Sequence, residues 1–207
     1  MTPLLAVTLL VGQAVVVDRV AVVVESRVIK TSDIERDARI TEFLNEQPLD
    51  VSAAARRKAV DRLIDQMLIR REIELGGYPI ASDEDATKML AGLRKERFRT
   101  DAAYKAALQR YGISEDDLQG HLRWQLTVLQ FIEERFRPGV LVRDQEIERY
   151  FQETFVKTAA SGTTLTPAVR RQIEEQIAGE RVNEHFNSWL KQVRDQAKPR
   201  FIPGALP

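Results

Sequence analysis

The chain has 207 residues, which is long enough to bury a core and suggests one domain with at most a small extension. Its 31 Lys and Arg residues balance 31 Asp and Glu residues, and this zero net charge argues against nonspecific nucleic-acid binding, which needs a basic surface. The absence of cysteine excludes thiol chemistry, thiolate metal sites and disulfides, and two histidines, each alone in a helical pattern, argue against a histidine metal site.

The first residues, Met1–Val17, are apolar and carry no charged side chain. Gly12 and Ala14 are small residues two apart, as a signal-peptidase site requires, so residues 1–14 are predicted to be a signal peptide that exports the chain to the periplasm. No Lys or Arg precedes the apolar run, which departs from the usual signal. A buried N-terminal strand is the alternative, whereas a membrane anchor is disfavoured because the run is shorter than about 20 residues.

A small β-hairpin is predicted over Val20–Ile29, where β-branched residues are interrupted by a polar turn at Glu25–Arg27. Ser32, followed three residues later by Glu35, forms a capping box that predicts a helix from Asp33. The expected inner face of this helix is Ile34, Ala38, Thr41 and Leu44.

The strongest helical pattern in the chain is Ala54–Gly77, with a predicted start near Ser52. Apolar residues recur there at helical spacing, and the charged residues lie mostly off this stripe. The pair Gly76–Gly77 can supply the left-handed residue that ends such a helix. We interpret it as the central core helix, with no chemical role, and its stripe is Val60, Leu63, Ile64, Met67, Leu68 and Leu75.

Serine or threonine caps predict three further helices, which begin after Ser82, Thr100 and Ser114. The first and third carry three carboxylates in their first turn, where the helix dipole favours negative charge. The third is expected to run to about Phe136, and its predicted buried face is Leu118, Leu122, Gln125, Leu126 and Leu129.

The C-terminal part begins with a predicted helix over Asp144–Phe155 and a predicted flexible loop of small residues at Lys157–Thr166. Pro167 favours the first position of a last helix that runs to about Ala197, and Arg200–Ile202 is expected to pair with the N-terminal strands. Two apolar patches on the last helix are out of phase, which indicates two different surroundings. The first patch is Ile173 and Ile177, and the second is Val182, Phe186, Trp189, Leu190 and Val193.

Catalytic and cofactor-binding patterns are missing from the sequence. There is no glycine-rich phosphate loop and no G-x-S-x-G motif. His121 lies one turn from Asp117 and Gln125, but no nucleophile is placed beside it, so a structural role is favoured. The carboxylate runs Asp83–Asp85 and Glu115–Asp117 follow serine caps, which explains them without a metal. We therefore expect no enzymatic activity, no cofactor and no metal.

Several segments together resemble a known family. They are Val20–Val24 with Val28-Ile29 and Ser32-Asp33-Ile34; Arg57, Val60, Leu63-Ile64-Asp65 and Leu68-Ile69 followed by Ile80 and Ser82-Asp83-Glu84; Tyr104, Leu108, Tyr111–Ser114, Leu118, Leu122-Arg123 and Gln125-Leu126; and Phe186, Trp189-Leu190 and Val193-Arg194. In this order they are similar to the chaperone module of the SurA family of periplasmic, parvulin-associated foldases. The resemblance covers most of residues 18–202, and it is carried by order and spacing because no single motif is diagnostic.

The resemblance implies a mainly α fold, a bundle of about six helices with a small N-terminal β-hairpin that pairs with a short C-terminal strand. Residues 18–202 would form one chaperone domain, with 18–155 as its first part and 167–197 as the helix that packs back. In that family a parvulin prolyl-isomerase domain of about a hundred residues separates the two parts. Here residues 156–166 occupy that place, which implies peptide binding without isomerisation. Arg143 also departs from the small capping residue usual there.

The expected function is therefore that of an ATP-independent periplasmic holdase for unfolded or extended polypeptides in outer-membrane protein biogenesis. A groove between the last helix and the preceding ones is the predicted binding site, because aromatic and aliphatic grooves hold extended apolar segments. Its candidate lining residues are Met89, Leu93, Tyr104, Leu108, Phe131, Phe136, Phe186 and Trp189.

Two alternatives stay open: a prolyl isomerase of the same family, and an assembly module for one specific partner. The length of the 157–166 loop also permits a homodimer with exchanged C-terminal helices. Neither nucleic-acid binding nor stable membrane insertion is expected.

Overall fold

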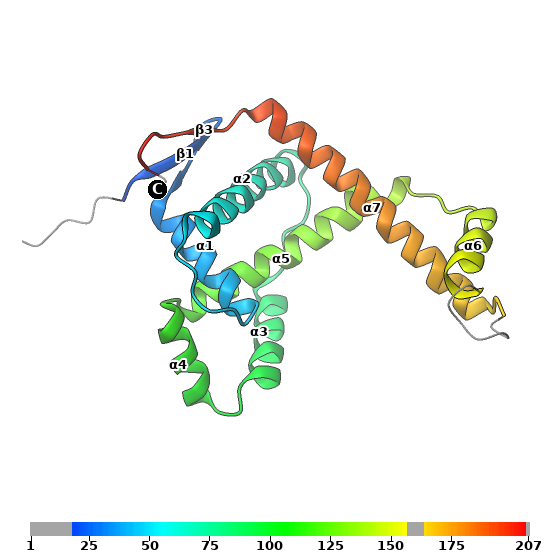
Figure 1. The fold of residues 1–207 in the computed structure, drawn as a ribbon, viewed down its shortest axis with the longest axis horizontal. Helices are drawn as coiled ribbons and strands as arrows, with labels where there is room; N and C mark the ends of the chain where they lie inside the picture. The colour runs from blue at the N-terminus through cyan, green and yellow to red at the C-terminus, as the bar shows by residue number, and fades with distance from the viewer. Residues whose placement is uncertain (1–17, 157–163, 206–207) are drawn as a thin grey trace, which may run out of the picture.

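The computed structural model describes residues 18–156 and 164–205. The predicted signal peptide, residues 1–14, and most of the predicted loop, 157–163, lie outside the described residues. The fold is mainly helical with one small sheet, as predicted (Figure 1). In chain order the elements are β1 (Val20–Val24), β2 (Arg27–Lys30), α1 (Thr31–Leu44), α2 (Ala53–Gly76), α3 (Asp83–Arg97), α4 (Asp101–Tyr111), α5 (Glu115–Phe136), η1 (Arg137–Gly139), α6 (Asp144–Tyr150), η2 (Phe151–Val156), α7 (Pro167–Ala197) and β3 (Arg200–Phe201).

The sheet joins the two ends of the domain. Strand β1 lies between β2 and β3 and is antiparallel to both, and Val22 pairs with Ile29 on one side and with Phe201 on the other. Glu25, in the turn of the hairpin, has a positive φ of 55°. Both the hairpin and the return of the C-terminal strand are thus confirmed.

Local capping chemistry sets most helix starts where the sequence predicted them. The side chains of Ser52, Ser82, Thr100, Ser114 and Thr166 each accept the backbone N–H of the residue three positions later. Gly77, with φ of 65°, ends α2 in the left-handed conformation, as predicted. These bonds satisfy backbone groups that a helix leaves unpaired at its ends.

Helix α1 begins earlier than predicted. Its N-cap is Lys30, whose backbone N–H donates to the Asp33 carboxylate over 3.0 Å. Ser32 is not the cap because its hydroxyl donates to the Asp18 carboxylate over 2.6 Å. Strand β2 runs directly into α1. The Ser32 hydroxyl, which the local pattern predicted to cap the helix, is engaged by Asp18 instead.

Helix α2 is the centre of the fold, but more than one of its sides is covered. Val60, Ile64 and Leu68 are buried against α1, the sheet and the end of α7, as predicted. The prediction for Leu75 is wrong, since 78% of this residue is exposed. Instead Ile69 and Ile73 are buried in the core between α2, α5 and α7. Near the end of the helix, Glu74 pairs with Arg27 and Arg71 pairs with Glu25.

The buried face of α5 differs from the predicted one after its second turn. Leu118 and Leu122 are buried, but Gln125 and Leu129 are exposed. The buried residues further along are Trp124, Thr127, Phe131 and Phe136. Thr127 is a polar residue in a buried position because its hydroxyl accepts the N–H of Ala81 over 3.1 Å and donates to the carbonyl of Arg123.

Helix α7 packs against different surroundings along its length, as its two apolar patches indicated. Ile173 and Ile177 pack against α6 and η2, and Val193 reaches the core beneath the sheet. Between them, Val182 joins the core of α2 and α5, together with Phe186, Trp189 and Leu190. In Figure 1, α6 and the first half of α7 project from the rest of the molecule as an arm.

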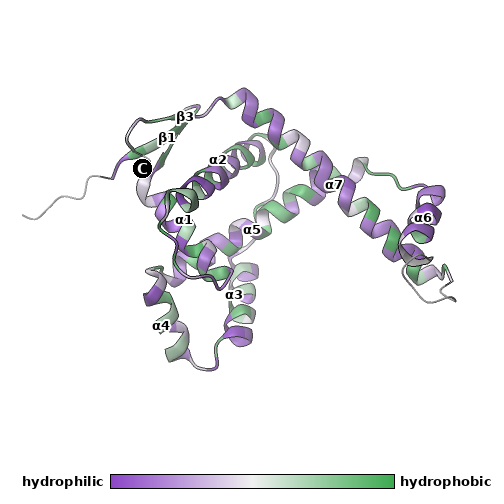
Figure 2. Ribbon diagram, in the orientation of Figure 1, coloured by the Kyte–Doolittle hydropathy of each residue, from purple (hydrophilic) through white to green (hydrophobic). Residues whose placement is uncertain are grey.

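The predicted helix over Asp144–Phe155 is present as α6 followed by the π-helical η2. Arg143 serves as its N-cap, and its backbone N–H donates to Glu146 over 2.9 Å, so the helix starts where expected despite the unusual cap. Hydrophilic and hydrophobic residues alternate along the helices in Figure 2. No helix in the described part of the chain is long and apolar enough to span a membrane.

A core test compares two residues of α5. Phe131 is fully buried and contacts Tyr78, Phe136 and Trp189, so Phe131→Ala should lower the free energy of unfolding by about 3–5 kcal/mol. Leu129→Ala, at an exposed position on the same helix, should change it by less than about 0.5 kcal/mol. Urea unfolding followed by circular dichroism measures both. Equal losses in the two variants would contradict this assignment of the core.

Candidate functional site

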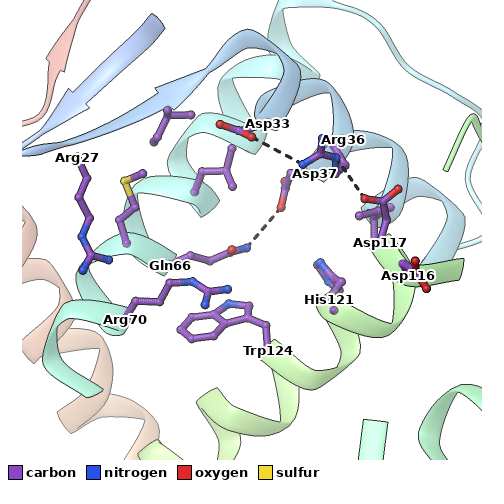
Figure 3. Close-up of a pocket in the computed structure, with 15 residues that line it drawn as sticks. Arg27, Asp33, Arg36, Asp37, Gln66, Arg70, Asp116, Asp117, His121 and Trp124 are labelled. Atoms are coloured by element: carbon purple, nitrogen blue, oxygen red, sulfur yellow. Dashed lines mark hydrogen bonds and ion pairs between the residues drawn. The ribbon is translucent and has the colours of Figure 1, made fainter. Parts of the chain in front are cut away.

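An open pocket of about 450 Å³ lies between β2, α1, α2 and α5 (Figure 3). Ile29, Ile40, Leu63, Met67 and Trp124 form its apolar part. Charged and polar side chains form the rest of the lining: Arg27, Asp33, Arg36, Asp37, Gln66, Arg70, Asp116, Asp117 and His121.

A second, smaller pocket of about 260 Å³ continues along the same two helices toward Ile80. It shares Arg70, Gly120 and Trp124 with the first pocket. We call the two pockets together the α2–α5 groove. No residue of α7 lines either pocket, so the groove lies where α2 and α5 are left uncovered by the last helix.

Asp37 is the most buried charge of the groove, with 5% of its surface exposed. Arg62 donates to one of its oxygens from Nε over 2.9 Å and approaches it from Nη2 at 2.6 Å. Gln66 donates to the other oxygen over 3.4 Å. A carboxylate compensated in this way fixes α1 against α2 and is not available as a free catalytic base.

His121 faces the same interior from α5, and Asp37 and Arg62 are the charged groups that influence it. Burial lowers the pKa of His121 below its ordinary value of 6.5, and Asp37 opposes this shift while Arg62 adds to it. The ring makes no hydrogen bond to another described residue, and no serine or threonine nucleophile lines this pocket. This arrangement does not form a nucleophile–base pair.

Arg70 and Trp124 stand at the junction of the two pockets. The guanidinium carbon of Arg70 lies 3.9 Å from the centre of the Trp124 ring, a cation–π contact that reaches across the groove from α2 to α5. Figure 3 shows the Arg70 side chain extending over the indole, with its charged end toward the interior of the pocket. Burial against its neighbours lowers the pKa of Arg70 from its ordinary value.

Gly120 contributes open space at the same junction. A Cβ atom placed on it would meet no atom within 4 Å other than those of its own helix. Glycine inside a helix costs about 0.5–1 kcal/mol relative to alanine. The absence of a side chain at Gly120 therefore widens the groove, although no neighbouring atom would clash with a Cβ there.

The eight residues predicted to line a groove fall into two separate groups, and none of them lines the α2–α5 groove. Leu93, Tyr104 and Leu108 belong to the core of α1, α3, α4 and α5, and Met89 is 40% exposed on α3. Phe131, Phe136, Phe186 and Trp189 pack against one another between α5 and α7.

The structure therefore does not gather the eight candidates at one site. Helical spacing identified their apolar character, but it carries no information on which helix covers them. Tyr104 does line a small pocket of about 210 Å³ between α3 and α4, although only 1% of the residue is exposed. A peptide contact by any of the eight stays a prediction.

Arg70, Gly120 and Trp124 were missed by reasoning from the sequence. The available signal was Gly120, a glycine inside an otherwise regular helical pattern, which usually has a packing or functional reason. Within the described residues no cluster of three or more His, Asp or Glu side chains is arranged to hold a metal. Apolar pockets with convergent polar groups are typical of binding sites.

The buried His121 gives stability a defined pH dependence. Because its folded pKa lies below 6.5, the unfolded chain takes up the proton more readily, so its contribution to stability is complete above about pH 6.5 and is lost as the pH falls below that value. The midpoint of urea unfolding should fall between about pH 7.5 and pH 5.5 in the original chain. This fall should be smaller in His121→Gln, which has no imidazole to protonate. His185→Gln, at an exposed position on α7, should leave the difference unchanged. An unaltered difference in His121→Gln would contradict this account.

Comparison with known proteins gives distant but extensive similarity. No family model matches the chain. It is 28% identical over 138 residues to chaperone SurA of Chromobacterium violaceum, which covers 64% of this chain and 32% of that protein. It is 24% identical over 186 residues to chaperone SurA of Escherichia coli O157:H7 and of Shigella flexneri, which covers 88% of this chain and 43% of each relative.

The chain thus spans less than half the length of the curated relatives it matches. The aligned part nevertheless extends over most of its own length. The resemblance indicated by the order of strands and helices is confirmed: the chain is similar to SurA chaperones over most of its sequence.

Proposed function

We propose that this chain is a chaperone that binds unfolded, extended polypeptides in the α2–α5 groove without ATP. The observation that carries the proposal is the groove itself, two adjoining pockets along α2 and α5 with an apolar part and charged walls. The similarity to SurA chaperones supports a chaperone role. We further propose that it acts in the periplasm on outer-membrane proteins, and the similarity to SurA chaperones and the apolar Met1–Val17 segment support this part of the proposal.

The groove suits an extended chain better than a compact metabolite. The adjoining pockets follow the helices, so a bound segment can continue from one into the next. The partly exposed Leu63 and Met67 offer apolar surface to client side chains. Methionine in particular adapts its shape to different partners, which favours binding of many sequences. Helical grooves of this kind are a recurring means of peptide recognition.

Binding without isomerisation is the second part of the proposal. Only the ten residues 157–166 connect η2 with α7, whereas a parvulin domain inserted there would need about a hundred. The groove has no nucleophile–base pair beside His121, which supports a passive role in holding clients. A homodimer with exchanged α7 helices stays a prediction, since α7 packs on α2 and α5 of its own chain here.

Gly120 provides the direct test. Gly120→Phe fills the junction of the two pockets without meeting any neighbouring atom at Cβ, so it should block the groove and leave the fold intact. A chemically unfolded outer-membrane protein is diluted from urea without ATP, and its aggregation is followed by light scattering. The original chain should slow aggregation, and the variant should need roughly tenfold more protein for the same effect, as a loss of about 1.4 kcal/mol in binding gives.

Gly92→Phe is the matched control, because Gly92 is exposed within α3 and its Cβ position is also open. It introduces the same apolar ring at a helical glycine far from the groove in sequence and should retain full activity. Circular dichroism confirms that both variants are folded. Equal activity of the two variants would argue against binding in this groove, and failure of the original chain to slow aggregation would refute the holdase role.

A further inference from the structure

Arg70 occupies a special place in the α2–α5 groove because it borders both pockets. A segment that passes from one pocket to the other must cross this side chain. Trp124 supports the guanidinium from one side, at 3.9 Å from its ring centre, and thereby limits the positions that it can take. A planar guanidinium held in this way is prepared for two parallel hydrogen bonds to a carboxylate.

The other arginines that line the groove already have acceptors. Arg27 pairs with Glu74, Arg36 lies 3.3 Å from Asp117, and Arg123 donates to the carbonyl of Ala81 over 2.8 Å. Arg70 makes no hydrogen bond or ion pair with any described residue. Glu74, one helical turn from Arg70, hydrogen-bonds Arg27 with its carboxylate. It therefore attracts the Arg70 guanidinium only at longer range.

Most carboxylates of the groove are engaged in turn. Asp33 accepts the backbone N–H of Lys30, Asp37 binds Arg62, and Asp117 accepts the Ser114 hydroxyl. Asp116 is exposed in the first turn of α5. The junction of the two pockets therefore presents one guanidinium that forms no ion pair with a carboxylate of the described residues and is attracted only at longer range by Glu74.

We propose that Arg70 binds the carboxylate of an aspartate or glutamate side chain within an extended polypeptide segment that crosses the α2–α5 groove. The inference rests on the proposed function and adds a sequence preference to it. The apolar surfaces on the two sides, with Met67 and Leu63 in one pocket and the exposed Ile80 in the other, fit apolar residues flanking the acidic one.

The position of Arg70 favours an internal side chain over the C-terminal carboxylate of a client. A terminal carboxylate would leave one of the two pockets empty, whereas an internal acidic residue allows the chain to fill both. Gly120 lies at the same junction and lets the client backbone approach α5 closely, because no Cβ stands in the way. The junction therefore offers both space for the client backbone, at Gly120, and a positive charge for its carboxylate, at Arg70.

The experiment uses two fluorescein-labelled nine-residue peptides that differ only in the central residue. Both consist of alternating leucine and serine, with Glu in one peptide and Gln in the other, and both have amidated C-termini. Fluorescence anisotropy gives the Kd of each for the full chain. The Glu peptide should bind about five- to tenfold more tightly, and this preference should shrink as salt is raised.

Arg70→Gln should bind both peptides with equal Kd, and Arg70→Lys, which keeps the charge without the planar fork, should recover part of the preference. Arg57→Gln removes the same charge from an exposed position near the start of α2 and should keep the full preference. A third peptide, with Gln at the centre and a free C-terminal carboxylate, should bind like the amidated Gln peptide.

The outcomes separate the inference from the proposed function. Equal binding of the Glu and Gln peptides by the original chain, or a preference that survives in Arg70→Gln, overturns the role of Arg70 and leaves peptide binding standing. Tighter binding of the free-carboxylate peptide also overturns the inference, because it assigns Arg70 to chain termini. Absence of binding by all peptides overturns both.

Discussion

The architecture depends on the attachment of α7 to α2 and α5. Phe186 and Trp189 of α7 meet Phe131 and Phe136 of α5, with ring centres 5.5–5.9 Å apart across the contact and within α7. Each aromatic side chain removes a large apolar area from water, and such pairs add about 0.5–1.5 kcal/mol beyond that area. This cluster holds α7 against α5, although Phe186 follows Phe136 by fifty residues in the chain.

Charged side chains reinforce the same attachment. Arg135 lies among the aromatic rings, 5.2 Å from the centre of Trp189, and pairs with Glu72 of α2. One helix turn from the C-terminal end of α7, Arg194 reaches Asp61 and Asp65 on α2. The attached helix then delivers β3 to the sheet, so the N-terminal and C-terminal ends of the domain are joined in one structure.

The position of α7 also determines where a binding surface remains. By covering one side of α2 and the C-terminal half of α5, it leaves the junction around Arg70, Gly120 and Trp124 open. The residues of that junction are supplied by the two longest helices of the N-terminal part, which are fixed by the cores on either side. A groove with rigid walls and a few adaptable side chains can bind many extended segments with little loss of its own conformational freedom.

Most elements and their ends follow from interactions between neighbouring residues in the chain. Capping by Ser52, Ser82, Thr100, Ser114 and Thr166, and termination at Gly77, depend on hydrogen bonds between neighbours in the chain, so they could be predicted without tertiary information. The mainly α class, the hairpin and the return of the C-terminal strand were also predicted. Where a tertiary partner competed for the same side chain, as Asp18 does for Ser32, the local prediction shifted by two residues.

The buried faces of the long helices and the position of the groove depend on how the helices pack together. Helical spacing gives several acceptable apolar faces on α2 and α5, and the choice between Leu75 and Ile73, or between Leu129 and Phe131, is made by the helix that packs against them. Seven of the eight predicted lining residues were separated into two cores for the same reason, and Met89 is exposed on α3. The α2–α5 groove brings together residues from β2, α1, α2 and α5 that are distant in sequence, and burial and charge pairing across such distances are properties of the packed fold and not of any local pattern.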